Sequence, residues 1–442
     1  MKASKDRSHT SWLKCMVCGV KVPLYGTVKF TCDCGGLYDV EHDHSSLGHV
    51  GAIGNRMIFD ARCRPGPKIG QRSGVWRFKE LVMPSLADEE IISLGEGIMP
   101  MLPAGNHLRK WIGGDLDLWI MPEGQTMTGS FKDLGGTVAM SVAKASGVKS
   151  VVCASTGDTS AMAAAYSAAA GISCTVVLPK GLVTAVQLTQ PIAHGAKIVL
   201  IPGSFDDAMR VVGELVASGR AFPVNSINPT RIEGHQATVF LAAQFFGWKM
   251  PDAFVVPVGN GSNSSSIGKA MRLLVNLGIA DEMAKLIGVQ SSAANPLARS
   301  WEEAYEHGSV PGIWERFYES QAVLGKTSAT AARIGNPVSF MKVMREIVLS
   351  NGAVLTAGEV ELNLAVMIAG QDGHLVCPQT GTALAGLRQA VMRKFVKKGS
   401  RVVVVSTATG LKFPEVAAAY GEKFMCESPS CETEAVAELI GV

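Results

Sequence analysis

The chain has 442 residues, 47% of them hydrophobic and 18% charged, a length that predicts two or three compact units rather than one ordinary domain. The formal net charge of +3 is small and the basic residues are scattered, so we expect no nucleic-acid partner. No segment approaches the roughly 18 consecutive apolar residues of a membrane span, and residues 1–13 lack the apolar run of a signal peptide, so we expect no membrane partner.

Four cysteines near the N-terminus form two pairs. Two residues separate Cys15 from Cys18, and one residue separates Cys32 from Cys34. Two thiolate pairs around a short β-like stretch could bind a zinc ion tetrahedrally. The metal would stabilise a unit that is too small to have a hydrophobic core of its own. We therefore predict a zinc-ribbon-like module over residues 1–66. The short spacing of the second pair keeps two alternatives open, a ribbon that has lost its metal and unrelated free thiols.

Three further cysteines, Cys153, Cys174 and Cys377, lie within apolar stretches and are typical of small buried residues. A reducing compartment fits this usage better than an oxidising one. We expect a cytoplasmic protein, although a plastid-imported protein after removal of its transit peptide would look the same.

From about residue 115 onward, short apolar runs alternate with helical stretches. Runs of Val and Ile without polar alternation are typical of strands buried on both faces. The predicted strands are 116–120, 150–154, 174–178, 197–201, 253–257 and 401–405. This order predicts an α/β architecture with largely parallel sheets, in which ligands bind beyond the carboxyl ends of the strands.

A lysine follows a short Gly/Ser turn in residues 128–133, which read TGSFKD. Burial lowers the pKa of a lysine, and an unprotonated amine can bond covalently to a carbonyl cofactor. A hydroxyl-rich turn at residues 155–160, STGDTS, follows at the start of a predicted helix of small residues. A reactive lysine beside an anion pocket indicates pyridoxal phosphate. The plain alternative is a surface lysine on a loop, since most lysines are exposed.

A third motif follows the predicted strand at 253–257. Residues 259–263 read GNGSN, and three serines then open a predicted helix. Small residues let backbone N–H groups approach a phosphate, and a helix N-terminus adds partial positive charge. In isolation such a motif is more often only a turn, but its position after a buried strand favours a phosphate-binding loop.

Together these motifs resemble the threonine synthase family of fold type II pyridoxal-phosphate enzymes, which are tryptophan synthase β-like, and most closely the plant-like branch with an Asp in the STGDT turn. The similarity runs from the cysteine module to about Phe413. The matching segments are 35–40, 129–134, 153–161, 190–193, 225–234, 257–263, 333–339, 377–381 and 406–413. The resemblance implies two parallel-sheet α/β domains beside the small cysteine module, and it suggests a homodimer. We expect a large cofactor-binding domain at 67–128 and 222–442, and a small domain at 129–221.

The resemblance also assigns roles to residues. It implies that Lys132 bonds to the cofactor and moves protons, that Thr407 bonds the pyridine nitrogen, and that Asp158 faces the cofactor's 3′-oxygen. The residues implied to hold the cofactor phosphate are Gly259, Asn260, Gly261, Ser262 and Asn263. The residues implied to bind the substrate are Ser155, Thr156, Thr159, Asn225, Ser226 and Arg231, with Arg231 placed on the substrate's phosphate, a role that the guanidinium fork suits.

The implied reaction converts O-phospho-L-homoserine and water into L-threonine and phosphate by γ-elimination and β-addition. The sequence departs from the family pattern at several positions, and these departures bear on the identity of the substrate. This chain has Ser262 where the family usually has Gly, His235 and Gln236 where it has Gln-Lys, Thr409 where it has His, and Met99 where many members have Thr. Two alternative functions therefore remain. One is a related lyase or replacement enzyme that acts on another amino acid, phosphorylated or not, and the other is a threonine or serine dehydratase. A non-catalytic binding protein on this scaffold stays open as well, although Lys132 and the glycine loop weigh against it. The sequence does not show whether S-adenosylmethionine activates the enzyme.

Overall fold

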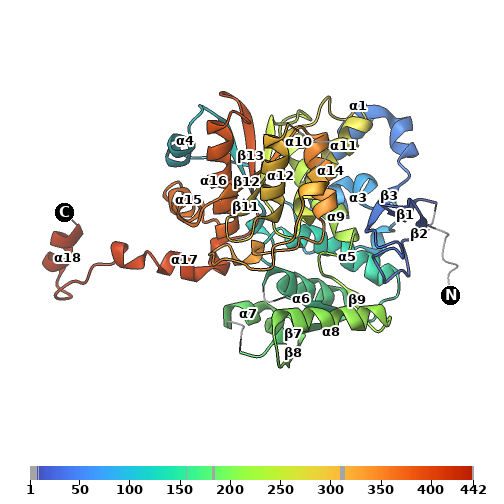
Figure 1. Cartoon of the computed structure of the whole chain (residues 1–442), viewed down its shortest axis with the longest axis horizontal. Coiled ribbons are helices and arrows are strands. Elements are labelled where there is room, and N and C mark those ends of the chain that lie inside the picture. Colours follow the sequence, from blue (N-terminus) through green and yellow to red (C-terminus); the bar gives the residue numbers. More distant parts are fainter. Residues whose placement is uncertain (1–6, 8, 156, 182–184, 309–313, 441–442) are drawn as a thin grey trace.

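The computed structural model describes residues 7, 9–155, 157–181, 185–308 and 314–440. Two largely parallel sheets lie one above the other in Figure 1, with the cysteine module on one side and the C-terminal segment extending from the other. The predicted α/β architecture is confirmed. No helix in the described part of the chain is both long and apolar enough to cross a membrane.

The cysteine module is a three-stranded antiparallel sheet in the order β2-β1-β3. Its strands are β1 (Ser11–Cys15), β2 (Lys21–Pro23) and β3 (Tyr38–His42), and β1 lies between the other two with Leu13 opposite Val40. The chain then enters α1 (Ser45–Ala61), which breaks at Gly51, where φ is 76°. Two short helices follow, α2 (Ile69–Arg72) and α3 (Lys79–Val82).

The larger sheet has six strands in the order β12-β11-β10-β13-β5-β4. These are β4 (Leu102–Pro103), β5 (Asp117–Pro122), β10 (Ala253–Pro257), β11 (Lys285–Ser291), β12 (Ala353–Ala357) and β13 (Arg401–Ser406). Only the pairing of β4 with β5 is antiparallel among the pairings of this sheet. The central strands are fully buried, as their unbroken Val runs predict.

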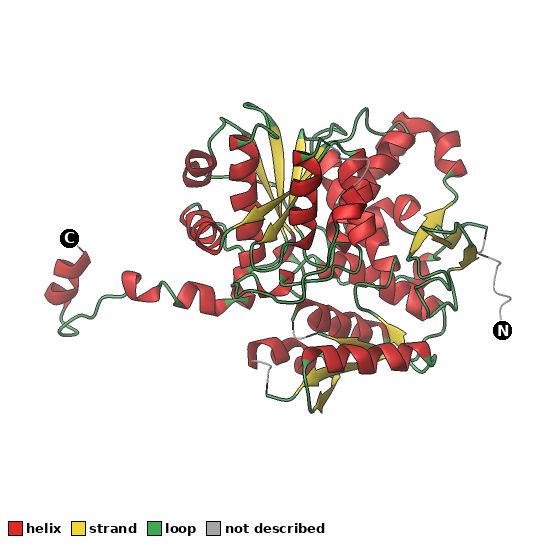
Figure 2. Cartoon of the chain, viewed as in Figure 1, coloured by secondary structure: helices red, strands yellow, loops and turns green. Residues whose placement is uncertain are grey.

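Helices surround the larger sheet in Figure 2. They are α4 (Asn106–Ile112), α10 (Ala237–Phe245), α11 (Ser262–Asn276), α12 (Pro296–Glu306), α13 (Trp314–Phe317), α14 (Phe340–Leu349), α15 (Glu359–Gln371) and α16 (Pro378–Met392). The chain ends in α17 (Pro414–Ala418) and α18 (Thr433–Ile440). Short 3₁₀ turns occur at Trp76–Phe78, Asp88–Glu90, Glu123–Gln125, Thr330–Ala332, Gly410–Lys412 and Gly421–Phe424.

The smaller sheet has four parallel strands in the order β8-β7-β6-β9. They are β6 (Ser150–Ala154), β7 (Ser173–Pro179), β8 (Lys197–Ile201) and β9 (Phe222–Pro223), accompanied by α6 (Asp158–Ala170), α7 (Ala185–Ala193) and α8 (Phe205–Ala217). All six strands predicted from the sequence are present. In the two larger sheets the prediction missed β11, whose apolar run Gly288 and Gln290 interrupt, together with β12 and the two-residue strands β4 and β9.

Two helices between the sheets pack almost backbone to backbone. They are α5 (Lys132–Ala145) and α9 (Thr230–His235). A Cβ added to Gly234 of α9 would collide with the carbonyl oxygen of Leu134 in α5. The close approach fixes the first turn of α5, which carries Lys132, against the helix that carries Arg231.

A buried carboxylate joins α9 to the cysteine module. Glu233 is 1% exposed, and its carboxylate accepts hydrogen bonds from the amine of Lys269 at 2.5 Å and the amide of Gln236 at 2.7 Å. His42 at the end of β3 lies 3.3 Å from the same carboxylate. The amine of Lys269 also donates to the carbonyl of Val40 in β3 at 2.6 Å. One side chain of α11 therefore ties together β3 and α9.

A second ionic contact fastens the same strand to α14. The carboxylate of Asp39 lies 2.5 Å from the amine of Lys342 and 3.0 Å from the guanidinium of Arg345. Burial by itself would raise the pKa of Asp39, but Lys342, Lys269 and Arg345 hold it well below its usual range. The module is thus docked through charges that only the folded chain brings together.

We predict that Lys269→Met destabilises the protein by about 3–5 kcal/mol, because removing one partner leaves the buried carboxylate of Glu233 without its cation. Equilibrium urea unfolding followed by circular dichroism measures the change. The matched control is Lys14→Met, which removes an exposed ion pair with Glu41 in the same module and should cost less than about 1 kcal/mol. Equal effects of the two substitutions would contradict the assignment.

Candidate active site

A cavity of about 1440 Å³ opens between the two sheets, at the carboxyl ends of β10 and β13. Its walls include the first turn of α5, the start of α6 and the loop that precedes α11. The sequence-predicted residues that line it are Lys132, Ser155, Asp158, Thr159, Asn225, Ser226, Gly259, Asn260, Gly261, Ser262, Asn263 and Thr407. Thr156 lies outside the described residues. Motifs up to about 280 positions apart in the sequence thus meet at one place.

The turn before Lys132 is held by the segment that follows β13. The amide of Phe131 donates to the carbonyl of Thr407 at 2.8 Å, and the amide of Thr409 donates to the carbonyl of Gly129 at 3.0 Å. Gly129 has φ of 80°, a conformation that favours glycine. These bonds present Lys132 as the first residue of α5, with its amine 3.6 Å from the centre of the Phe131 ring.

The environment of Lys132 favours the neutral amine. The pKa of Lys132 is lowered to about 7 by burial and by the nearby cations Arg231 and Lys412, although Asp158 and Glu123 act in the opposite direction. A lysine with such a pKa is largely available as a nucleophile near neutral pH. The amine can therefore bond to a carbonyl group placed in the cavity.

The loop from Gly259 to Ser262 is built to admit an anion. Gly261 precedes α11 with φ of 86°, and a Cβ at that position would lie 2.6 Å from Val343. The first amide groups of α11 have no partner within the helix and point into the loop. Asn263 is 5% exposed, yet neither its amide nitrogen nor its oxygen has a hydrogen-bond partner within the described part of the chain. A helix N-terminus with an unsatisfied amide side chain fits a bound phosphate.

Thr407 lies on the opposite side of the cavity from the small sheet, directly after β13. Its backbone amide donates to the hydroxyl of Thr380 at 3.2 Å, and its own hydroxyl lies 3.6 Å from the thiol of Cys377. Burial raises the pKa of Cys377, so this thiol stays neutral. The two side chains in contact with Thr407 are thus uncharged, and they fit a pyridine nitrogen that receives a hydrogen bond without being strongly protonated.

Asp158 begins α6 and is 9% exposed. Its carboxylate lies 2.8 Å from the amine of Lys412, which also donates to the carbonyl of Thr128 at 2.8 Å. Sequence reasoning did not assign Lys412, although it belongs to the matching segment 406–413. The pair connects the small sheet's first helix to the turn before Lys132, so it bridges the two walls of the cavity.

The expected substrate residues fall into two groups. Ser155, Thr159, Asn225 and Ser226 line the cavity, and the amide of Asn225 bonds both the carbonyl and the N–H of Ala154 at the end of β6. Arg231 instead lies behind the cavity wall and is fully buried.

The guanidinium of Arg231 is incompletely paired. One nitrogen donates to the carbonyl of Val224 at 3.2 Å, whereas Nε and the second terminal nitrogen have no partner among the described residues. Burial lowers the pKa of Arg231 to about 10, so it remains a cation near neutral pH. Because buried charges are normally paired, we expect the two free nitrogens to bind an anion.

The departures at His235 and Gln236 have structural counterparts. Gln236 donates to Glu233, and the cation beside that carboxylate comes from Lys269 of α11. The ring of His235 packs on Phe131, with 4.9 Å between ring centres. Burial, together with Arg231 and Lys132, holds the pKa of His235 well below its usual value, so this ring is neutral. In this chain a neutral imidazole ring thus packs behind Lys132, and the cation beside Glu233 comes from α11.

The four N-terminal cysteines converge. The sulfur atoms of Cys15, Cys18, Cys32 and Cys34 all lie within 4.8 Å of one another. The separations are 3.5 Å for Cys15 and Cys34 and 3.6 Å for Cys18 and Cys32. A tetrahedral site with metal–sulfur bonds of about 2.3 Å has sulfur atoms about 3.8 Å apart, so the four thiols fit a zinc ion. Gly35, with φ of 85°, makes the tight turn that the one-residue spacing needs.

Comparison with known proteins agrees with this site. Residues 92–408 match the family described as pyridoxal-phosphate dependent enzyme. Threonine synthase from Methanocaldococcus jannaschii is 34% identical over 405 residues, which cover 91% of this chain and 93% of the relative. Threonine synthase 2, chloroplastic, from Arabidopsis thaliana is 35% identical and covers 90% and 75% of the two chains.

The solved structures show the fold. The crystal structure of threonine synthase from Escherichia coli superposes with a TM-score of 0.65 at 16% identity, covering 96% of this chain and 94% of that one. Maize serine racemase superposes with a TM-score of 0.60 at 15% identity, covering 79% and 97%. These likenesses support a fold type II architecture.

We predict that Lys132→Ala abolishes turnover but leaves a folded protein, because among the lysines that the structure describes only this one combines a cavity position with a lowered pKa. The wild-type protein, loaded with pyridoxal phosphate, should show the absorbance of the lysine-bound cofactor and lose it on borohydride reduction. Lys412→Ala serves as the control lysine in the same cavity and should keep both signals. A Lys132→Ala protein that also keeps both would disprove the assignment.

Proposed function

We propose a threonine synthase activity for this chain, because it belongs to the pyridoxal-phosphate dependent enzyme family and, within that family, to the threonine synthases. The activity converts O-phospho-L-homoserine and water into L-threonine and phosphate. One observation carries the proposal beyond the family: two separate groups of anion donors occur near Lys132. The loop before α11 lines the same cavity, and the buried, incompletely paired Arg231 is close enough to lower the pKa of Lys132. The first suits the cofactor phosphate, and the second a phosphorylated substrate.

The proposed cofactor site uses the residues already described. Gly259, Asn260, Gly261, Ser262 and Asn263 would hold the phosphate, Thr407 would bond the pyridine nitrogen, and Asp158 would face the 3′-oxygen. The unsatisfied amide of Asn263 supports this arrangement. When bound, pyridoxal phosphate stabilises negative charge at Cα and Cβ of the substrate, which allows phosphate to leave from Cγ and water to add at Cβ.

Lys132 is the proposed proton carrier. Its pKa of about 7 lets its amine accept a proton and return it at neutral pH. Asp158 and Lys412 form an ion pair with each other at the cavity wall. The neutral ring of His235 behind Phe131 adds no further charge.

The substrate's anionic groups would be bound from the small-sheet side. Ser155, Thr159, Asn225 and Ser226 offer hydroxyl and amide donors, and the N-terminus of α6 adds partial positive charge. The two free nitrogens of Arg231 lie behind this wall and call for an anion. We propose that the substrate phosphate supplies it. Sequence reasoning also placed Thr156 in this group.

We extend the proposal to the organisation of the chain. Strands β6, β7 and β8 of the four-stranded sheet support a small domain at 129–221, although the edge strand β9 of that sheet lies just beyond residue 221. The six-stranded sheet supports a large domain at 67–128 and 222–442, beside the module at 1–66. Free cysteine thiols are consistent with a cytoplasmic location. The family resemblance supports a homodimer.

A substrate panel tests the function. O-phospho-L-homoserine should release phosphate and give threonine faster than O-phosphoserine gives product, and homoserine, serine and threonine should be poor substrates. An uncharged hydroxyl would leave the donors around Arg231 unpaired, which a polar site penalises strongly. Arg231→Ala should raise the KM for O-phospho-L-homoserine with little change in cofactor affinity, at a cost of about 2–5 kcal/mol.

Both parts of this test have a contrary outcome. Brisk release of a keto acid from another amino acid, with no threonine from O-phospho-L-homoserine, would identify a related enzyme with a different substrate. If Arg231→Ala instead loses cofactor affinity while the substrate KM is unchanged, Arg231 binds the cofactor phosphate rather than the substrate phosphate.

We also propose that Cys15, Cys18, Cys32 and Cys34 hold one structural zinc ion, because four thiolates leave no open position for water. Protein purified without chelator should contain about one zinc per chain, and the double variant Cys15→Ser/Cys18→Ser should contain none. Cys153→Ser, which changes a buried cysteine outside the cluster, is the control and should keep the zinc. Equal metal content in the wild type and the double variant would rule the site out.

A further inference from the structure

The C-terminal residues 419–440 form an arm that extends from the body of the molecule (Figure 1). It leaves the body after α17, where Val416 is still buried beside Phe413. Beyond that point the large apolar side chains are exposed: Phe424, Met425, Val436, Leu439 and Ile440 are between 40% and 76% exposed. Within these 22 residues the sequence has five glutamates and one lysine. The arm is thus both acidic and apolar.

Helix α18 in this arm is amphipathic. Val436, Leu439 and Ile440 follow the i, i+3, i+4 spacing of one helix face, whereas Glu434 and Glu438 lie on the opposite face. The helix has eight residues and buries none of them. An isolated helix of this length is unstable in water, so α18 needs an apolar surface to pack against.

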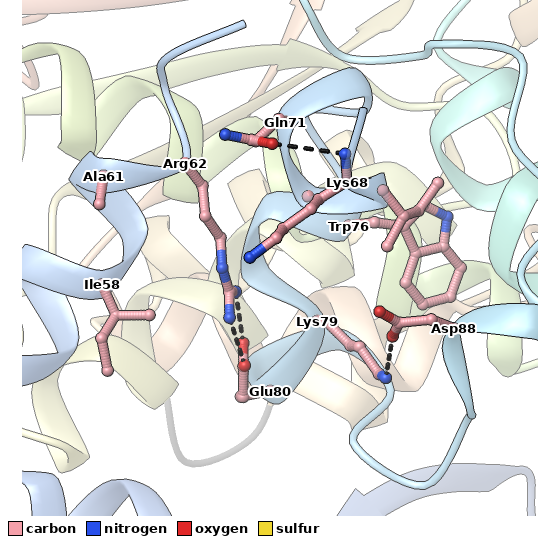
Figure 3. A pocket seen from close by; sticks show the side chains of 11 residues that line it. Ile58, Ala61, Arg62, Lys68, Gln71, Trp76, Lys79, Glu80 and Asp88 are labelled. Atoms are coloured by element: carbon pink, nitrogen blue, oxygen red, sulfur yellow. Dashed lines mark hydrogen bonds and ion pairs between the residues drawn. The ribbon is translucent and has the colours of Figure 1, made fainter. Parts of the chain in front are cut away.

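A matching apolar surface lies on the second half of α1. Ile53, Met57 and Ile58 are 74%, 68% and 41% exposed. Ile58 also borders a cavity of about 620 Å³, whose other apolar lining comes from Ala61, Ile69 and Trp76 (Figure 3). We call these apolar residues together the α1 surface. Exposed apolar groups gathered around a hollow are typical of a protein interaction site.

Cations surround the α1 surface. Residues 53–79 contain seven Lys and Arg residues and one acidic residue, Asp60. In the cavity of Figure 3, Arg62 pairs with Glu80 and Lys79 pairs with Asp88. Lys68 also lines the cavity, and Arg64 and Arg72 lie within four residues of it in the sequence. All three are exposed and have no ionic partner among the residues that the structure describes. The charge of this region therefore complements that of the arm.

Two other exposed apolar sites, on α15 and α7, suit the arm less well. Val360 and Leu364 on α15 are 77% and 41% exposed, but Glu359 and Glu361 begin the same helix and would repel an acidic segment. Val186 on α7 lines the catalytic cavity. The α1 surface combines exposed apolar side chains with unpaired cations.

The arm and the α1 surface of one chain lie at opposite ends of the molecule in Figure 1. A second copy can bring them together. We propose that the C-terminal arm of one copy docks on the α1 surface of a second copy, with Val436, Leu439 and Ile440 of α18 facing Ile53, Met57 and Ile58. If both arms do so, the two contacts are equivalent and related by a two-fold axis. This contact does not depend on the reaction that the enzyme catalyses.

Site-specific photo-crosslinking of the full-length, cofactor-loaded protein tests the contact. The photoreactive residue p-benzoylphenylalanine replaces Met57, and irradiated protein is separated on a denaturing gel. We expect a band at twice the chain mass, in which mass spectrometry finds position 57 joined to the peptide that contains Leu439. The yield should fall as salt rises, because the complementary charges are screened.

Two variants make the test specific. Leu439→Glu should reduce the crosslink at least tenfold, and Lys68→Glu should reduce it several-fold at low salt. Val360→Glu, which places the same charge on the exposed face of α15, should leave the yield unchanged. Turnover per chain measured on the same samples shows that the variants are folded.

Several results would overturn the proposal. The first is the absence of any product between position 57 and the arm. The second is a crosslink between them that runs at the mass of a single chain, since this would mean that the arm folds back on its own molecule. The third is an undiminished yield in Leu439→Glu.

Discussion

The buried carboxylate of Glu233 is the contact on which the site's geometry depends. A carboxylate that is 1% exposed keeps its charge only with close partners, and here they are Lys269 of α11 and His42 of β3. Helix α11 begins at the phosphate-binding loop, and α9 carries Arg231 two residues before Glu233. One ionic contact therefore holds the cysteine module, the proposed cofactor-phosphate site and the proposed substrate arginine in fixed relation.

Lys132 and Arg231 depend on this scaffold in opposite ways. Burial makes the lysine amine available as a neutral group, with a pKa of about 7, whereas the guanidinium stays charged with its pKa near 10. The two lie on helices that pack almost backbone to backbone at Gly234. A cation beside the lysine helps to keep the amine neutral, and that same cation is short of a partner. The proposed substrate phosphate would supply that partner.

The sequence alone determined the architecture and most of the residues of the site. Unbroken Val and Ile runs predict buried parallel strands because side chains on both faces of such a strand meet helices. The motifs around Lys132 and Gly259 follow from backbone chemistry: a phosphate needs glycines and free amides, and a covalent cofactor needs an amine. The cysteine spacing likewise predicted a cluster, and the four sulfur atoms converge. Such features are local, so their residue types and spacing can be read directly.

Only the tertiary structure decided which charges meet. Nothing in the sequence indicated that Lys269, 33 positions after Gln236, is the cation beside Glu233. Lys412 pairs with Asp158 across more than 250 positions, and Arg231 lies behind the cavity wall rather than in it. Spacing along the chain carries no information about such pairs, because the packing of α9 against α5 and of α11 against β3 sets their distances. The same holds for the arm and the α1 surface, whose exposure is a property of the folded chain.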